Sequence, residues 1–241
     1  MKRFRLFFAL ALLVCTACST AYNGSGRASK PNVVVLGDSY STFEGCIPDG
    51  YANWYFYGQG GNDVHNPAQC WWSLLCAQKG YNLLYNCSYS GSAICYTGYE
   101  NMGPETSFIE RAKVDIVAED GTIGRCGAKP DILYIFGGTN DDWSHSPLGE
   151  IPDPAQWRSG NLEEYFPAVC YLFGYLKERL PDTQIVFILN TDLSRQISRW
   201  MPAICEQFGV KCVTLFQIDK ISNHPSVAGM KKIADQVAAA M

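Results

Sequence analysis

Five short apolar runs alternate along the chain with segments of helical periodicity. The runs are rich in β-branched and aromatic residues, as strands are, and they span 33–36, 81–86, 131–136, 184–189 and 211–216. Apolar residues recur at helical spacing within 71–79, 107–117, 161–180, 193–208 and 226–240. Such alternation predicts right-handed βαβ crossovers and a parallel sheet covered on both faces. We therefore predict one three-layer α/β/α domain, without an internal repeat or a second core.

The predicted helices carry their own start and stop signals. Gly80 follows the first strong helical segment and ends it, as glycine does at helix C-termini. Asn161 is the expected N-cap of the long helix over 161–180. Pro202 marks a place where the helix over 193–208 could break.

An aromatic insertion interrupts the alternation at residues 44–66. It holds Tyr51, Trp54, Tyr55, Phe56 and Tyr57 among five glycines. Loops of this length without regular structure tend to be functional. Aromatic side chains serve equally well to bind a ligand or to pack down on the domain. Both interpretations stay open at this point.

The first apolar run delivers a serine to the edge of the predicted sheet. Residues 33–36 stop at Gly37-Asp38-Ser39, a sequence typical of a tight turn. Ligands of open parallel sheets bind at the carboxyl ends of the strands, which is where Ser39 is expected. Gly, Asp and Ser are also ordinary turn residues, so Ser39 becomes a candidate nucleophile only if a base and an oxyanion hole accompany it.

Other residues with the required chemistry follow the remaining strands. The chain has three histidines: His65 lies in the insertion and His145 follows the third strand, whereas His224 lies between the fifth strand and the last helix. His224 can therefore reach Ser39 as a general base, the alternative being a helix-capping surface residue. Gly91, after the second strand, could offer a backbone N–H, and Asn140, after the third, a side-chain amide.

These four blocks together resemble the SGNH/GDSL hydrolase superfamily over residues 32–240. The blocks are Gly37-Asp38-Ser39-Tyr40-Ser41, Gly91, Gly138-Thr139-Asn140-Asp141 and His224-Pro225. The resemblance implies a flavodoxin-like five-stranded sheet of order 2-1-3-4-5. It also implies Ser39 as the nucleophile and His224 as the base, with an oxyanion hole built from the Ser39 N–H, the Gly91 N–H and the Asn140 side chain.

One block departs from the superfamily pattern. The superfamily usually has an aspartate three residues before the catalytic histidine, and this chain has Ile221 there. Asp219, five residues before His224, could orient the imidazole if the loop bends; otherwise a backbone carbonyl could fix its tautomer. A Ser–His dyad and a triad with Asp219 are both open. The oxyanion hole would supply much of the rate enhancement in either case.

The N-terminus predicts export. Basic residues at 2, 3 and 5 precede an apolar stretch over 6–14 that is too short to span a membrane, which indicates a signal peptide over 1–17. The sequence Cys15-Thr16-Ala17-Cys18-Ser19 resembles a bacterial lipobox with Cys18 as the lipidated residue, although ordinary signal cleavage stays possible. Residues 18–30 are a polar, flexible tether and 31–241 the hydrolase domain. We expect a protein of the bacterial cell envelope, lipid-anchored in the periplasm or at the outer membrane.

The net charge and the cysteine content limit the kinds of partner and cofactor that we expect. Loss of the leader's three basic residues leaves 16 basic against 23 acidic side chains, a formal net charge of −7. An acidic chain without a basic cluster argues against nucleic acid, and against a membrane except through the lipid. Nine cysteines remain, from Cys46 to Cys212, and an odd number leaves a thiol free. Their spacing fits no zinc site, so we expect no metal and no cofactor.

The leading hypothesis is an ester hydrolase that acts on a small-molecule or glycan ester. The aromatic insertion and the exported location favour an O-acetylated or otherwise acylated carbohydrate as the substrate. A lipase or thioesterase stays open. The competing class is a glycan-binding lipoprotein that keeps the fold without catalysis, for which the isoleucine at 221 is the best argument. A flavin-carrying flavodoxin-like protein is a distant third, because it would have no use for the His224 loop.

Overall fold

The computed structural model describes residues 29–100 and 102–241. The predicted signal peptide, the lipidation residue Cys18 and most of the tether lie outside the described residues. Within them, no helix combines the length and the apolar character that a membrane span requires. All nine cysteines in this part of the chain have free thiols.

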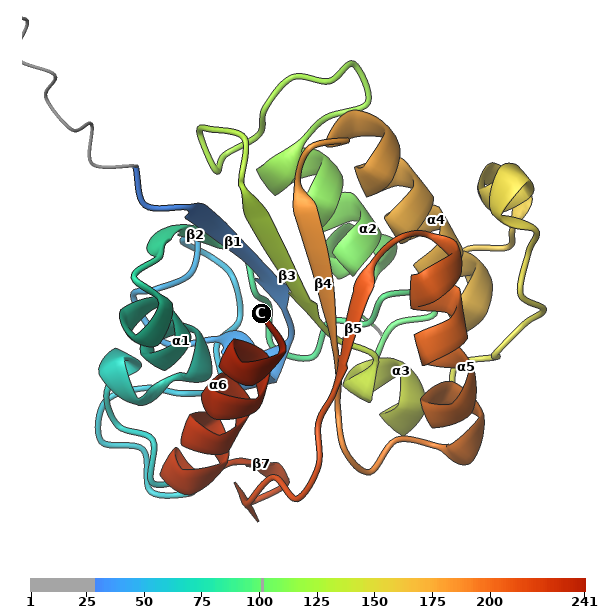
Figure 1. Ribbon diagram of the computed structural model, residues 1–241. Coiled ribbons are helices and arrows are strands. Elements are labelled where there is room, and N and C mark those ends of the chain that lie inside the picture. Colours follow the sequence, from blue (N-terminus) through green and yellow to red (C-terminus); the bar gives the residue numbers. More distant parts are fainter. Residues whose placement is uncertain (1–28, 101) are drawn as a thin grey trace, which may run out of the picture.

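Five parallel strands form one sheet in the order β2-β1-β3-β4-β5 (Figure 1). The strands are β1 (Asn32–Gly37), β2 (Asn82–Asn86), β3 (Ile132–Phe136), β4 (Gln184–Leu189) and β5 (Lys211–Thr214). This is the predicted flavodoxin-like order, and the predicted α/β fold is confirmed. Reversal of the strand order between β1 and β3 opens a crevice at the carboxyl edge, where such sheets bind ligands.

Helices cover both faces of the sheet, with α1 and α6 on one face and α2, α4 and α5 on the other (Figure 1). The helices are α1 (Trp71–Lys79), α2 (Phe108–Arg111), α3 (Thr139–Trp143), α4 (Tyr165–Arg179), α5 (Arg195–Gln207) and α6 (Val227–Ala240). Short helical turns are η1 (Ser39–Ser41), η2 (Pro67–Gln69), η3 (Pro104–Thr106), η4 (Ala112–Ile116) and η5 (Pro154–Ser159).

Strand β1 shows why the sheet is buried on both sides. Val33 and Val35 pack with the α1 and α6 side chains, whereas Val34 and Leu36 pack with those of α2 and α4. All four side chains are buried. Successive strand residues point to opposite faces, so a strand between two helical layers needs an unbroken apolar run.

Two predicted helices differ in detail from the structure. Helix α4 begins at Tyr165 instead of Asn161, because the N–H groups of Tyr165 and Phe166 donate to the carbonyls of Pro147 and Leu148. A neighbouring loop thus does what a cap would do. Helix α5 runs through Pro202 without a break, and this residue lies on the exposed side of the helix.

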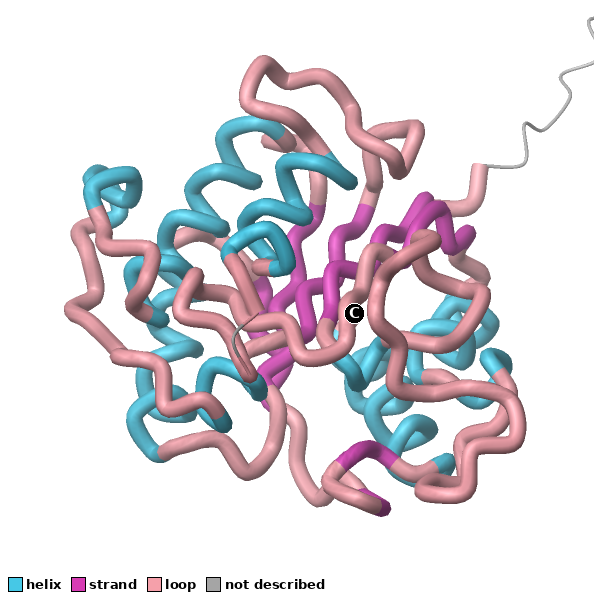
Figure 2. Tube along the Cα trace, turned by 180° about the vertical axis from the view of Figure 1, so that it is seen from behind, coloured by secondary structure: helices cyan, strands magenta, loops and turns pink. Residues whose placement is uncertain are grey.

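A two-stranded hairpin, β6 (Lys220–Ile221) and β7 (His224–Pro225), lies after β5 and was not predicted. Seen from behind, it lies at one end of the molecule among long loops (Figure 2). It carries His224, so its shape decides where the candidate base lies.

The packing of β4 against α4 gives a stability prediction. Phe187 is fully buried and its ring lies 5.7 Å from that of Phe173. We expect Phe187→Ala to lower the free energy of unfolding by about 3–5 kcal/mol, because it removes apolar contacts and leaves a cavity. Urea denaturation measures this. Phe216→Ala removes a phenylalanine that is 59% exposed and serves as the control, with an expected change of about 0.5 kcal/mol or less.

Candidate active site

Ser39 lies in the first turn after β1. The Asp38 carboxylate accepts a hydrogen bond from the Tyr40 N–H (3.0 Å) and so caps the turn η1. A Cβ added at Gly37 would lie 2.6 Å from the Ser41 and Ser88 side chains, so only glycine fits where β1 ends. Burial raises the pKa of Asp38 to about 7. Ser39 itself is only 4% exposed.

Ser39 and His224 form a hydrogen-bonded pair. Ser39 Oγ lies 2.9 Å from His224 Nε2, and His224 Nδ1 lies 3.0 Å from the carbonyl oxygen of Ser222. A carbonyl can only accept, so Nδ1 carries the proton and Nε2 faces Ser39 as an acceptor. This is the tautomer that a base for the Ser39 hydroxyl requires.

Asp219, the acid that sequence reasoning offered as a partner for His224, has another role. Its carboxylate accepts a hydrogen bond from the Ser226 hydroxyl. Ser226 Oγ in turn accepts from the Gly229 N–H (3.1 Å) at the start of α6. Asp219 therefore supports a helix N-terminus, and the expectation that it orients His224 is corrected. Of the two candidate partners for the His224 imidazole, Asp219 and a backbone carbonyl, the structure shows the backbone carbonyl, that of Ser222.

The hairpin turn aims that carbonyl at the imidazole. Ser222 and Asn223 have φ values of 51° and 62°, and they join Ile221 and His224, which are paired in the hairpin. Two central residues with positive φ are typical of a type I′ turn. Asparagine adopts this conformation readily, whereas serine is strained in it.

The aromatic insertion holds this hairpin in place. Asn62, at the far end of the insertion, is buried, and its amide donates to three carbonyls of the hairpin, those of Ile221 (3.0 Å), His224 (3.4 Å) and Pro225 (3.3 Å). The Tyr55 hydroxyl donates to the same Pro225 carbonyl (2.8 Å). The insertion thus supplies donors to three carbonyls of the hairpin.

Further bonds join the turn itself to its surroundings. The Ser222 hydroxyl donates to the Gly61 carbonyl (2.8 Å), and the Tyr40 hydroxyl donates to the Asn223 carbonyl (2.6 Å). Tyr40 follows the candidate nucleophile directly. The turn that carries the base is therefore bonded both to the insertion and to the turn that carries Ser39.

Aromatic rings cover the His224 imidazole. The Trp54 indole stacks on it at 3.7 Å with an interplanar angle of 9°, and the rings of Tyr40, Tyr55 and Trp143 lie edge-on at 5.1, 6.3 and 6.1 Å. Trp54 and Tyr55 therefore pack down on the site. Other aromatics of the insertion, such as Phe56 and Tyr57, stay 41% and 61% exposed.

Burial under these rings makes the imidazole a weak base in the free protein. His224 is 5% exposed, and the loss of hydration lowers its pKa to about 4. The Ser222 carbonyl raises the pKa of His224 because it stabilises the protonated ring. The positive charge of Lys220 lowers this pKa further. At neutral pH the imidazole is uncharged and ready to accept a proton.

The candidate oxyanion donors lie on the loops after β2 and β3. Asn140 is buried at the start of α3 and uses one amide N–H on the Ser92 carbonyl (2.8 Å). Its second amide N–H stays available to a ligand. Gly91, next to Ser92, has a φ of 84°, a conformation that glycine adopts without strain. Asn140 thus fixes the loop on which Gly91 lies.

Two buried charged residues hold that loop. Arg111 donates to the carbonyls of Gly37 and Cys87 and to the Ser92 hydroxyl, so one guanidinium joins the ends of β1 and β2. The Asp141 carboxylate accepts from the N–H groups of Ile94 and Cys95 (2.9 to 3.0 Å). Hydrogen bonds to charged groups are stronger than those between neutral groups, so Arg111 and Asp141 hold the loop after β2 firmly in place.

Sequence reasoning missed several of these residues. His65 and His145 are exposed, while Asn62, Ser222 and Arg111 had no motif to mark them, and Trp54 was singled out only as one aromatic residue of the insertion. Several of their contacts join distant parts of the sequence, 74 positions apart for Arg111 and Gly37 and 159 to 163 positions apart for Asn62 and the hairpin. In the part of the chain that the structure describes, no three His, Cys, Asp or Glu residues gather as a metal site.

Comparison with known proteins points to one family. The sequence profile described as GDSL-like lipase/acylhydrolase matches residues 31–241. A GDSL-like lipase from Bacteroides ovatus ATCC 8483 is 37% identical, with a TM-score of 0.77, over 88% of this chain and 97% of that one. A GDSL-like lipase from Bacteroides uniformis ATCC 8492 is also 37% identical, with a TM-score of 0.78, over 89% and 96%.

A more distant structural neighbour is a family two carbohydrate esterase from Clostridium thermocellum in complex with cellohexaose. It is 17% identical with a TM-score of 0.59, over 87% of this chain and 62% of that one, which shows a shared fold. A search of curated proteins finds no significant match.

The low pKa of His224 predicts an unusual pH profile. The base must be neutral, so activity is lost only as the pH falls through the pKa of about 4, and not near the ordinary value of 6.5. The measurement is kcat/KM for a soluble ester against pH. Asp38→Asn is the control, because it removes the other group that titrates nearby and keeps the acceptor for Tyr40. An acid limb near 6.5 would contradict the prediction.

Asn62 is predicted to act as a positioning residue for His224. We expect Asn62→Ala to lower kcat by about tenfold to a hundredfold with little change in KM, because the hairpin carbonyls lose their donor and the imidazole moves. The ring also becomes better hydrated, so the acid limb of the pH profile should move up towards 6.5. Asn53→Ala, an exposed change in the same insertion, is the matched control. An unchanged limb with reduced kcat would indicate a purely structural role.

Proposed function

The chain belongs to the GDSL-like lipase/acylhydrolase family, a family of ester-hydrolysing enzymes, and on that premise we propose that Ser39 and His224 hydrolyse O-acylated, in particular acetylated, carbohydrates. The observation that carries the proposal is the 2.9 Å contact between Ser39 Oγ and an imidazole whose tautomer is fixed by the Ser222 carbonyl. A serine next to such a base is equipped for nucleophilic attack.

The proposed reaction has two halves. Ser39 Oγ attacks the ester carbonyl while its proton passes to His224 Nε2, and the resulting oxyanion is stabilised by the Ser39 and Gly91 N–H groups and the Asn140 amide. The imidazolium then donates that proton to the departing alcohol, which leaves an acyl-serine. A water molecule, deprotonated by the same imidazole, attacks the acyl group, and the imidazolium returns that proton to Ser39 Oγ as the acid is released.

The carbonyl behind His224 changes the energetics of the first half. A carboxylate would stabilise the imidazolium by charge, whereas the Ser222 carbonyl offers only a dipole. The rings of Trp54 and the neighbouring tyrosines keep water from the positive charge as well. The oxyanion donors must therefore supply a larger share of transition-state stabilisation than they do in a full triad.

The carbohydrate assignment has narrower support. The exposed ring of Trp143, 6.1 Å from the His224 imidazole, offers a face that suits a sugar ring. The likeness to the family two carbohydrate esterase extends to the fold alone, so it does not decide the substrate. The family also includes lipases by description, which makes a fatty acyl ester the second candidate substrate.

Export and lipid attachment at Cys18 are part of the same proposal, and their support is the leader sequence and the lipobox-like segment that follows it. A surface-tethered enzyme would meet polymeric glycans that do not enter the cell.

The serine assignment predicts loss of a covalent label. We expect a fluorophosphonate probe to label the wild-type chain and not Ser39→Ala, because the probe reacts only with an activated serine. Acetate release from acetylated xylan and from acetylated monosaccharides, followed with the same pair, tests the substrate. Ser159→Ala, an exposed serine, is the matched control and should keep both signals.

Each assignment can fail separately. Unchanged labelling of Ser39→Ala would refute the nucleophile. Labelling that depends on Ser39, without release of acetate from any acetylated carbohydrate, would refute the substrate class and turn attention to fatty acyl esters.

A further inference from the structure

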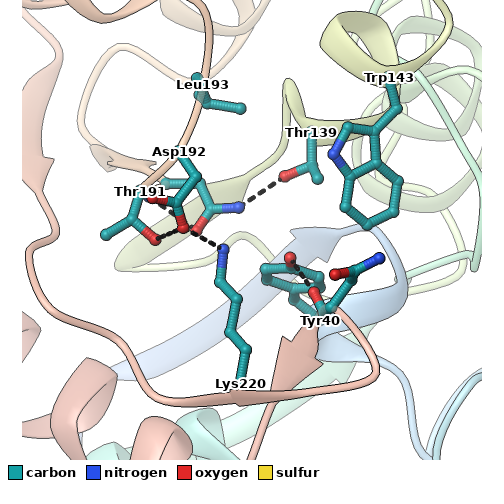
Figure 3. A pocket seen from close by; sticks show the side chains of 9 residues that line it. Tyr40, Thr139, Trp143, Thr191, Asp192, Leu193 and Lys220 are labelled. Atoms are coloured by element: carbon teal, nitrogen blue, oxygen red, sulfur yellow. Dashed lines mark hydrogen bonds and ion pairs between the residues drawn. The ribbon is translucent and has the colours of Figure 1, made fainter.

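A small polar cavity of about 170 Å³ is lined by side chains from the segments that carry the candidate site (Figure 3). Three residues of its wall, Tyr40, Thr139 and Asn223, are the direct chain neighbours of Ser39, Asn140 and His224. Chain neighbours of the candidate nucleophile, oxyanion amide and base therefore meet in the wall of this cavity, although the proposed reaction assigns it no role.

The cavity shares a hairpin with His224, the group that must protonate the leaving alcohol. A general acid has to reach the oxygen it protonates, so the alcohol of the ester lies next to His224 Nε2. The hairpin that carries His224 also supplies Lys220 and Asn223 to the cavity wall. Trp143 lines the cavity too, and its ring lies 6.1 Å from the imidazole.

An ion pair forms one wall of the cavity. Lys220 Nζ lies 3.0 Å from Asp192 Oδ2, which also accepts from the Thr191 hydroxyl (3.1 Å). The two charges cancel, so the wall offers donors and acceptors without favouring an anion or a cation. Neighbouring hydroxyl groups, each of which donates and accepts, match such a wall.

Trp143 forms the opposite wall (Figure 3). Its indole is 36% exposed and stands across the cavity from the Lys220–Asp192 pair. A sugar ring has an apolar C–H face and a polar rim, so it can lay the face on the indole and turn hydroxyls to the ion pair.

The size and polarity of the cavity select among alcohols. Pockets that enclose drug-sized ligands measure about 300–1,000 Å³, so 170 Å³ suits one ring and no long chain. A fatty alcohol or acyl tail would bury the ion pair against hydrocarbon, which is costly for charged groups.

We propose that this cavity is the subsite for the sugar ring of the alcohol, with Trp143 as the stacking face and Asp192 and Lys220 as the hydroxyl-binding pair. The inference rests on the proposed carbohydrate esterase function and adds where the carbohydrate binds. It assigns specificity to residues outside the four sequence blocks.

The test compares two acetyl esters that differ in the alcohol. Acetylated methyl glycosides fill the subsite, whereas the two-carbon leaving group of vinyl acetate is too short to reach it. We expect Trp143→Ala and Asp192→Asn each to lower the ratio of kcat/KM for the glycoside ester to that for vinyl acetate by about tenfold or more. Free methyl glycosides should competitively inhibit vinyl acetate hydrolysis by the wild type, and less so in both variants.

Matched controls are present in the chain. Trp200→Ala removes another exposed tryptophan, and Asp182→Asn breaks another surface pair, in which Lys129 Nζ lies 2.7 Å from the carboxylate. Both should leave the ratio and the inhibition unchanged.

The outcomes separate this inference from the proposed function. Glycoside ester turnover with an unchanged ratio in Trp143→Ala and Asp192→Asn would overturn the subsite and leave the function standing. Absence of turnover of every glycoside ester would overturn the proposed substrate class. In that case inhibition by methyl glycosides that is lost in the two variants would still support the subsite, and absence of inhibition would overturn it.

Discussion

The hydrogen bond between His224 Nδ1 and the Ser222 carbonyl is the interaction on which the rest of the site depends. It fixes the tautomer and ring orientation that the superfamily usually obtains from an aspartate at the position of Ile221. A carbonyl two residues away can face the ring only if the chain reverses tightly. The positive φ values of Ser222 and Asn223 provide that reversal. The departure at Ile221 and the hairpin are therefore two parts of one arrangement.

A two-stranded hairpin of this size is not stable alone, so it needs support from elsewhere. The insertion after the Ser39 turn gives that support through the Asn62 amide, the Tyr55 hydroxyl and the Gly61 carbonyl. The alternatives of a binding flap and of aromatics packed on the domain are thus both too simple. Part of the insertion holds the base in position, and other aromatics remain at the surface.

Sequence reasoning could predict the features that depend on local pattern. The buried apolar runs such as 33–36 predicted the strands of the parallel sheet. The blocks at Ser39, Gly91, Asn140 and His224 indicated which strand ends would hold catalytic residues. It could not predict the hairpin, because its pairing rests on tertiary bonds from Asn62, about 160 residues earlier. Arg111 was not recognised for a related reason: an arginine within a helical pattern looks exposed until the loops around it are known.

The structure of the base also bears on the choice between an enzyme and a binding protein on the same fold. A histidine that only lined a glycan site would gain nothing from a fixed tautomer, and its burial under Trp54 would expose less surface to the ligand. Holding Ser222 at positive φ is unfavourable by roughly 1–3 kcal/mol, and such strain is usually retained where it serves function. Here the strain keeps Nε2 unprotonated and aimed at Ser39 Oγ. That arrangement is useful to a residue that accepts a proton, and it has no value for one that merely contacts a sugar.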